Sequence, residues 1–187
     1  MIEGLSVLDL VMGAIYGVVQ GISEFLPISS SGHLALMPKL FSFEDPGVAF
    51  DLWLHVGTAL AVIIYFNRDL TPLLKEIPHL LNREHTSEHR GRFINLAVAT
   101  LVTLLFVIFL KDMAEGVGRN PKLISFNLVF FGVLMWAGDR FGHKDDQENF
   151  DKIQWGKAAL IGLFQGIAVF PGVSRSGITL TVARFLG

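Results

Sequence analysis

Three stretches of the chain are apolar over nearly the length that a membrane-crossing helix needs. They run from about 47 to 66, from 93 to 110 and from 123 to 138, and the middle stretch contains no charged residue. A helix needs about 20 predominantly apolar residues, with roughly 17 as the lower limit, to cross a bilayer. A buried helix of a soluble core is the alternative for any one stretch. Because polar, charged connectors separate all three, the pattern favours transmembrane helices.

Two further apolar regions are interrupted by loops rich in Pro, Gly and Ser. The first covers about 8–43 and is broken at 27–33, and the second covers about 158–187 and is broken at 171–177. Most of the resulting half-helices are too short to cross a bilayer. Irregular backbone at membrane depth is tolerated only where protein or a polar cavity surrounds it. We therefore expect both regions to be re-entrant helix-loop-helix hairpins in an all-α integral membrane protein.

The two interrupted regions are copies of one another. Residues 17–32 align without a gap on 162–177, at an offset of 145 and with eight identities in sixteen positions. Three predicted spans separate the copies, so the second copy enters the membrane from the opposite face. This pattern predicts an inverted-topology repeat, with 1–145 as the first unit and 146–187 as the start of the second. A complete second unit would extend past the end of this chain, so we expect a C-terminal truncation.

Basic residues are distributed unequally among the connectors. The connectors at 67–92 and 139–157 lie on the same side in this topology and contain five and four Lys or Arg, whereas the connector at 111–122 contains three. Lys and Arg accumulate in cytoplasmic loops. The first two connectors are therefore assigned to the cytoplasm, and the first hairpin enters from outside.

The composition agrees with lipid as the surrounding solvent. Hydrophobic residues make up 51% of the chain and charged residues 17%, against about 25% charged residues in soluble domains. Cysteine is absent, which excludes disulfides and cysteine metal sites. The net charge of −2 gives no reason to expect a nucleic-acid partner.

Two charged side chains lie at the interruptions of the apolar hairpins. Glu24 comes directly before the first loop, and Arg175 lies within the second. A charge at membrane depth costs about 2.5–3.5 kcal/mol on insertion scales, and such residues usually mark functional sites. We expect the two loops to meet, so that both side chains share one cavity. The alternative is a buried ion pair that only holds the hairpins together.

The second loop, PGVSRSG, has the composition of a phosphate-binding loop. Its two glycines, Gly172 and Gly177, allow the backbone to approach a ligand closely. Ser174 and Ser176 can donate hydroxyl hydrogen bonds. The loop precedes a predicted helix, whose first N–H groups attract anions, and Arg175 adds a planar donor fork suited to phosphate. A plain helix cap is the alternative interpretation of such a loop.

The first loop, PISSSGH, supplies three hydroxyls and an imidazole. A serine with a nearby histidine and carboxylate is the set needed for nucleophilic or general acid–base catalysis. Glu24, Ser30 and His33 lie within ten residues of one another. The alternative is that the serines cap the following helix and that His33 bonds only to the backbone.

The other histidines have less defined roles. His55 lies four residues after Asp51 in the first predicted span, so both share a helix face and are candidates to line the cavity. His79, His85 and His89 lie in a charged connector and are interpreted as solvated loop residues.

Two motifs carry a resemblance to a known family that covers essentially the whole chain. The run QGISEFLPISSSGH at 20–33 resembles the acidic Glu/Gln-x-x-x-Glu signature and Ser-Ser-x-Gly-His of bacterial undecaprenyl-diphosphate phosphatases, the bacitracin-resistance family. The run PGVSRSGIT at 171–179 is similar to that family's Pro-Gly-x-Ser-Arg-Ser-x-x-Thr motif. Both motifs occur in the expected order and at the expected separation.

The resemblance implies a role for each matching residue. Glu24 would be the catalytic carboxylate and would help to hold a metal ion, Ser30 the nucleophile and His33 the acid–base partner. Gln20 occupies the first position of the acidic motif, where other members have Glu, so this chain lacks one carboxylate of a two-carboxylate site. The catalytic set also includes Arg175, and the implied substrate-binding residues are Gln20, Ser29, Ser31, Ser174, Ser176 and Thr179.

The resemblance also implies an activity and a location. The family hydrolyses undecaprenyl diphosphate to undecaprenyl phosphate and phosphate, which recycles the lipid carrier for peptidoglycan synthesis and confers bacitracin resistance. It is a multi-pass enzyme of the bacterial plasma (inner) membrane whose site faces outward. The implied cofactor is a divalent cation, Mg²⁺ or else Ca²⁺. The implied partners are the polyprenyl diphosphate and membrane lipid, with a homo-oligomer left open.

Three alternative functions differ in which features they explain. Inverted repeats with broken helices are also typical of transporters, so a polyprenyl-phosphate flippase is the main alternative. The set of Glu24, Ser30 and His33 favours hydrolysis, because binding alone does not require it. The other large class of membrane lipid phosphatases is set aside, since its Lys-x6-Arg-Pro motif is missing and Thr181 stands where its later histidine is needed. A purely structural membrane protein does not explain two charged loops in apolar regions.

Overall fold

The computed structural model describes residues 7–79, 87, 89–143 and 154–187. Throughout these ranges the regular structure is helical, with short 3-10 turns at Ile77–His79 and Ile167–Val169. His85 and the predicted boundary between the two repeat units, at residue 145, lie outside the described residues. The α-helices are α1 (Val7–Phe25), α2 (Ser30–Phe41), α3 (Val48–Tyr65), α4 (Asn67–Leu74), α5 (Arg90–Val117), α6 (Pro121–Phe141), α7 (Trp155–Gly166) and α8 (Arg175–Leu186).

Four of the described helices are long and apolar enough to cross a membrane. Three of them, α3, α5 and α6, coincide with the three predicted spans. The fourth is α1, whose 19 residues the sequence pattern assigned to one half of a hairpin. At about 1.5 Å per residue, a helix of that length reaches nearly across the apolar core of a bilayer. The chain is therefore an all-helical, multi-pass membrane protein.

The outer surface of the helices is apolar. Phe109, Tyr65 and Trp53 are 80%, 79% and 74% exposed, and α3 has no buried residue. Soluble monomers rarely expose contiguous apolar patches larger than a few hundred Å². An apolar surface of this kind is expected to contact membrane lipid.

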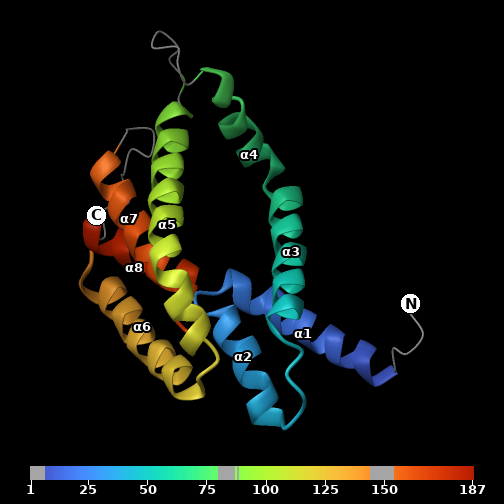
Figure 1. Ribbon diagram of the computed structural model, residues 1–187. Coiled ribbons are helices and arrows are strands. Elements are labelled where there is room, and N and C mark those ends of the chain that lie inside the picture. Colours follow the sequence, from blue (N-terminus) through green and yellow to red (C-terminus); the bar gives the residue numbers. More distant parts are fainter. Residues whose placement is uncertain (1–6, 80–86, 88, 144–153) are drawn as a thin grey trace.

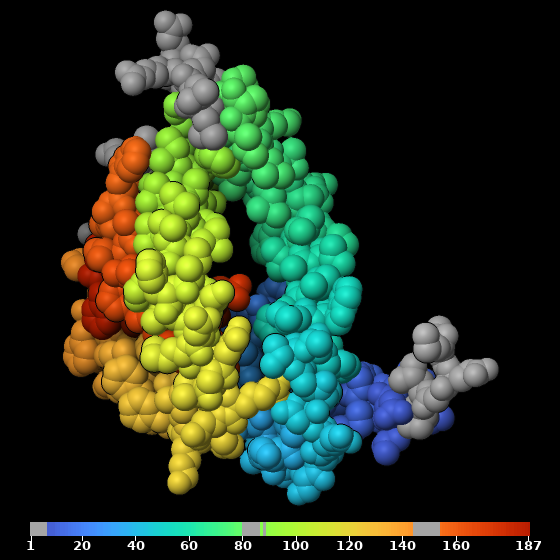
Figure 2. Space-filling view, in the orientation of Figure 1, coloured from blue at the N-terminus to red at the C-terminus, as the bar shows by residue number. Residues whose placement is uncertain are grey.

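The helices form two groups that are joined through α4 and α5 at one end and through α2 and α6 at the other. Figure 1 shows α5, α6, α7 and α8 gathered on one side, α3 and α4 standing on the other, and α1 and α2 at the base of the second group. The space-filling view shows a deep hollow between α3 and α5 (Figure 2). The tips of the two interrupted regions meet between the groups, where the site lies.

Each interrupted region has its own small apolar core. In the first, Tyr16, Leu34 and Met37 are buried between α1 and α2. The Tyr16 ring makes edge contacts with Phe43 and Phe50, at centroid distances of 5.7 and 5.4 Å. In the second, a cluster of Val173, Ile178 and Val182 is packed by α6 and α7. Each loop therefore rests on its own apolar core.

Small residues let α5 and α7 pack closely. A Cβ atom on Gly162 would lie 2.3 Å from the Ala99 carbonyl oxygen, so only glycine fits there. Thr103 in α5 donates its hydroxyl to the Gly162 carbonyl at 2.9 Å. Close approach at small residues, with hydroxyl hydrogen bonds across the interface, is how helices associate in membranes.

A charged cluster joins three segments at the base of the molecule. Arg119, between α5 and α6, donates to Asp45 in the α2–α3 connector and to Asp51 in α3, the latter at 2.7 Å. The Asp51 side chain is 17% exposed, so its charge is largely removed from solvent and compensated by Arg119. The cluster thus fixes the start of α3.

Candidate functional site

The serines that end the two loops have the same local geometry. Ser29 and Ser174 adopt positive φ angles of 68° and 66°, which are uncommon for residues other than glycine. Each serine caps the helix that follows, because its Oγ accepts a hydrogen bond from the N–H three residues later, at 3.3 Å in the first loop and 3.1 Å in the second. The sequence similarity of 17–32 and 162–177 therefore extends to the conformation of the two capping serines.

The two loops contact each other directly. Ser29 Oγ accepts a hydrogen bond from the Gly172 N–H at 3.0 Å. Ser176 Oγ donates to the Leu26 carbonyl at 3.5 Å. A Cβ atom on Gly32 would lie 3.1 Å from the Gly172 Cα, so the backbones approach as closely as glycine allows. The prediction that the loops meet is confirmed.

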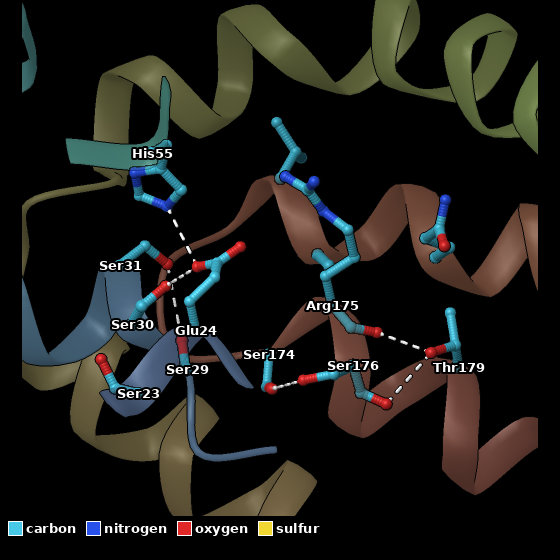
Figure 3. Close-up of a pocket in the computed structure, with 13 residues that line it drawn as sticks. Ser23, Glu24, Ser29, Ser30, Ser31, His55, Ser174, Arg175, Ser176 and Thr179 are labelled. Carbon is cyan, nitrogen blue, oxygen red and sulfur yellow. Dashed lines mark hydrogen bonds and ion pairs between the residues drawn. The ribbon is translucent and has the colours of Figure 1, made fainter. Parts of the chain in front are cut away.

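A pocket of about 450 Å³ opens where the loops meet. Figure 3 shows Glu24 and Ser30 from the first region, Arg175 from the second, and His55 from α3 around this space. The pocket combines one carboxylate, one guanidinium, one imidazole and several hydroxyls. Its lining residues are Ser23, Glu24, Ser29, Ser30, Ser31, His55, Gln165, Ala168, Val169, Ser174, Arg175, Ser176 and Thr179.

Glu24 is the centre of the polar contacts in the pocket. Its Oε2 accepts a hydrogen bond from Ser30 Oγ at 2.5 Å and another from Gln20 Nε2 at 3.1 Å. The distance from Oε2 to His55 Nε2 is 3.5 Å. The carboxylate is therefore oriented by groups from α1, α2 and α3 and is placed to accept the proton of the Ser30 hydroxyl.

His55, a candidate from the sequence to line the cavity but without an assigned role, lies in the pocket. Its Nδ1 lies 2.7 Å from the Asp51 carbonyl oxygen. A carbonyl only accepts, so Nδ1 carries a proton and Nε2 is the nitrogen directed at Glu24. The signals available in the sequence were the four-residue spacing from Asp51 and the position inside an apolar span.

Arg175 is the cation of the pocket. It is the first residue of α8, and its guanidinium extends towards the space in front of Glu24 (Figure 3). No hydrogen bond or ion pair to this guanidinium is found within the described part of the chain. The neighbouring hydroxyls of Ser174 and Ser176 lie 3.3 Å apart, and the Thr179 hydroxyl donates to the Arg175 carbonyl at 3.0 Å. An anion in the pocket would meet a guanidinium with its donors available.

Two of the predicted site residues lie beside the pocket and do not line it. Gln20 is 1% exposed and donates from Nε2 to Glu24 and to Thr58 Oγ1, the latter at 3.3 Å. His33 lines a neighbouring pocket of about 350 Å³, and its Nδ1 lies 2.8 Å from the Ser29 carbonyl oxygen. The structure thus brings together Glu24, Ser30 and Arg175 but leaves the His33 imidazole outside the space that they share.

The donor set of the pocket fits a cation held by one carboxylate. No group of three or more His, Asp or Glu suited to a metal ion occurs among the described residues. The three polar contacts of Glu24 all involve Oε2, which leaves Oε1 available. Mg²⁺ usually keeps several waters and binds one or two carboxylates together with substrate phosphates. Glu24 with a bound phosphate is such a set.

Comparison with known proteins identifies relatives over nearly the whole chain. Residues 13–187 match the family model described as bacitracin resistance protein BacA. The undecaprenyl-diphosphatase of Desulforudis audaxviator is 43% identical over 176 residues, which cover 94% of this chain and 65% of the relative. That of Idiomarina loihiensis is 41% identical over 181 residues, 96% of this chain and 67% of the relative.

A third relative matches over a similar extent. The undecaprenyl-diphosphatase of Moorella thermoacetica is 41% identical over 178 residues, 92% of this chain and 64% of the relative. The chain thus spans about two thirds of the length of the curated relatives that it matches. Since the family model covers all but the first twelve residues, the chain belongs to the bacitracin resistance protein BacA family.

Proposed function

We propose that this protein hydrolyses undecaprenyl diphosphate to undecaprenyl phosphate and phosphate. The observation that carries the proposal is the Ser30–Glu24 pair facing Arg175 across one pocket. The names of the relatives support the substrate. The reaction would recycle the lipid carrier for peptidoglycan synthesis and so confer resistance to bacitracin.

The chemistry follows from the hydrogen bond between Ser30 and Glu24. Glu24 takes the Ser30 proton while Oγ attacks the terminal phosphorus, and the bond from that phosphorus to the bridging oxygen breaks. The departing group is undecaprenyl phosphate. Positioning and charge stabilisation do most of the work in phosphoryl transfer, and Arg175 supplies donors that match the phosphoryl oxygens. Water then releases phosphate from Ser30 and restores the hydroxyl.

The other pocket residues orient the diphosphate. The Ser31, Ser174 and Ser176 hydroxyls and the first N–H groups of α8 are donors for phosphate oxygens. Thr179 lines the same pocket, and Gln20, outside the pocket, donates a hydrogen bond to the Glu24 carboxylate. A divalent cation on Glu24 and the substrate phosphates would neutralise charge on the diphosphate. We retain His33 as a proposed acid–base residue on the strength of the family motif.

We also propose an inverted-topology repeat of two re-entrant hairpins, with units at 1–145 and from 146 onward. The matching φ angles and caps of the two loops support it. Three long helices lie between the two copies, which also supports the repeat. After an odd number of membrane crossings, the second copy enters from the opposite side of the membrane. In this topology the protein lies in the inner membrane with its site facing outward.

The test is phosphate release from undecaprenyl diphosphate by the purified protein in lipid vesicles, with and without a chelator. We expect release that requires a divalent cation and that is lost in Ser30→Ala, Glu24→Gln and Arg175→Ala. A flippase is the competing function, because broken helices are also a transporter feature. If all three variants released phosphate like the wild type, hydrolysis at this site would be excluded and transport would be favoured.

A further inference from the structure

Ser29 differs from the other serines of the pocket in how its hydroxyl is used. Its Oγ accepts from two backbone donors, the Gly32 N–H at 3.3 Å in its own helix and the Gly172 N–H at 3.0 Å in the other loop. Ser29 is 3% exposed. Both lone pairs of this buried oxygen are engaged, and the Ser31 Oγ, 3.5 Å away, can accept its proton, so little capacity remains for a substrate phosphate.

The equivalent serine of the second loop makes no such link. Ser174 Oγ accepts from its own helix, at Gly177 N–H, and lies near the Ser176 hydroxyl. At the offset of 145, the residue that corresponds to Gly172 is Pro27. Proline has no backbone N–H, so the mirror-image bond to Ser174 cannot form. Of these two equivalent bonds, from a backbone N–H of one loop to the capping serine of the other, the structure has only the one from Gly172 to Ser29.

The bond spans the two halves of the proposed catalytic machinery. Ser29 immediately precedes Ser30, whose hydroxyl contacts Glu24. Gly172 lies three residues before Arg175, and its φ of 93° together with the Ile124 carbonyl, 2.6 Å from where a Cβ would lie, excludes any larger residue. Asn127 fixes the same turn by donating to the Pro171 carbonyl at 2.9 Å. A shift between the loops would move Arg175 relative to Ser30.

We infer that Ser29 is a positioning residue: its bond to the Gly172 N–H aligns the second loop with the Ser30–Glu24 pair. The equivalent serine, Ser174, is the one that faces the substrate. This inference rests on the proposed function only for its kinetic consequence. The link between the loops is a property of the fold and can be measured separately.

The competing explanation is that Ser29 is only a helix cap, and Ser29→Gly separates the two roles. Glycine is within a few tenths of a kcal/mol of serine as an N-cap, and it adopts a positive φ without strain. The variant therefore keeps the start of α2 but removes the acceptor for Gly172. The matched control is Ser174→Gly, which makes the same change at φ 66° in the other loop.

The first measurement is hydrogen exchange at the Gly172 amide in the reconstituted protein, with α5 amides as the folding reference. Losing one buried hydrogen bond should raise exchange about five- to tenfold in Ser29→Gly, while Ser174→Gly leaves Gly172 protected. If the Gly172 amide stayed protected in Ser29→Gly, the link and the inference would both be wrong. This outcome does not depend on whether the protein hydrolyses anything.

The second measurement is kcat and KM for undecaprenyl diphosphate, determined separately in each variant. Misalignment should lower kcat in Ser29→Gly by roughly 10- to 100-fold with little change in KM, whereas Ser174→Gly should mainly raise KM. A normal kcat in Ser29→Gly would overturn the positioning role. If wild-type protein released no phosphate while Gly172 exchange still rose in Ser29→Gly, the proposed function would fail and the link would stand.

Discussion

Ser30 Oγ donates a hydrogen bond to Glu24 Oε2 at 2.5 Å, although the two residues belong to different helices. Helix α1 ends at Phe25 and α2 begins at Ser30, so the loop between them folds the hydroxyl back onto the end of the preceding helix. This contact places the Ser30 hydroxyl beside a carboxylate that can accept its proton, within a largely apolar protein. Five predictions test the site and the fold around it.

Ser30→Ala should lower turnover of undecaprenyl diphosphate by several orders of magnitude, because it removes the attacking oxygen. Single-turnover phosphate release measures the loss. Ser23→Ala is the control, since the Ser23 hydroxyl lines the same pocket but donates to the Val19 carbonyl, and it should stay within about threefold of wild type. Near-normal turnover in Ser30→Ala would instead assign the attack to a water molecule.

Arg175→Ala should weaken substrate binding and turnover together, because it removes the pocket's cation. Arg175→Lys should recover little, since a point charge does not reproduce the planar donor fork. Steady-state kinetics and binding of a non-hydrolysable diphosphate measure both effects. Arg184→Ala on the same helix is the control, because Arg184 is 47% exposed and pairs with Asp139. Full recovery by lysine would contradict bidentate recognition.

Glu24→Gln keeps the shape of the side chain but removes its charge. We expect cation-dependent phosphate release to be abolished while the thermal unfolding midpoint in detergent changes little. Adding a chelator to the wild type should reproduce the loss, and adding Mg²⁺ should reverse it only where Glu24 is present. Cation-dependent release by Glu24→Gln would show that the cation is held elsewhere.

Gly32→Ala should push the two loops apart, since its Cβ would lie 3.1 Å from the Gly172 Cα. Overpacking of this kind typically costs about 1–3 kcal/mol, and it should lower the unfolding midpoint and turnover. Gly21→Ala is the control, because nothing lies within 4 Å of the added Cβ, and a helical alanine should be neutral or stabilising. Equal behaviour of the two variants would mean that the loops tolerate separation.

The orientation can be tested with single cysteines, because the chain has none of its own. Ser87→Cys lies in the connector assigned to the cytoplasm, and Lys122→Cys lies at the start of α6 on the opposite side. An impermeant thiol reagent should label Lys122→Cys in intact cells and Ser87→Cys only after permeabilisation. The reverse labelling would invert the topology and turn the site inward.

The sequence predicted the spans well because apolar length is a direct property of the chain. The predicted span at 93–110 lies inside α5, which extends to Arg90–Val117 with its polar ends included. Helix α4 was not predicted, because Asn67–Leu74 contains charged residues and Pro72 and reads as a connector. Helix α1 was predicted as one half of a hairpin, and its 19 residues also reach spanning length.

The site was predictable where a residue type is out of place in its surroundings. Glu24 and Arg175 are charges in apolar regions, and their shared pocket followed from the repeat. The partnership of His55 with Glu24 was not predictable, because it depends on how α3 crosses α1. The sequence left the direction of the His33 ring open between catalysis and a bond to the backbone, because sequence does not fix a rotamer, and the structure has its Nδ1 at 2.8 Å from the Ser29 carbonyl oxygen.

The bond from Gly172 to Ser29 also sets the order in which this protein can be assembled. The two residues are 143 positions apart, and a chain is made from its N-terminus at about 5–20 residues per second. Ser29 is therefore synthesised several seconds before Gly172, which donates to it. In the same way Asp51 is synthesised before its partner Arg119, which comes 68 residues later. The pocket between the two loops therefore cannot form until the second loop has been synthesised, and a nascent chain stopped before residue 172 carries Ser30 and Glu24 without Arg175 opposite them.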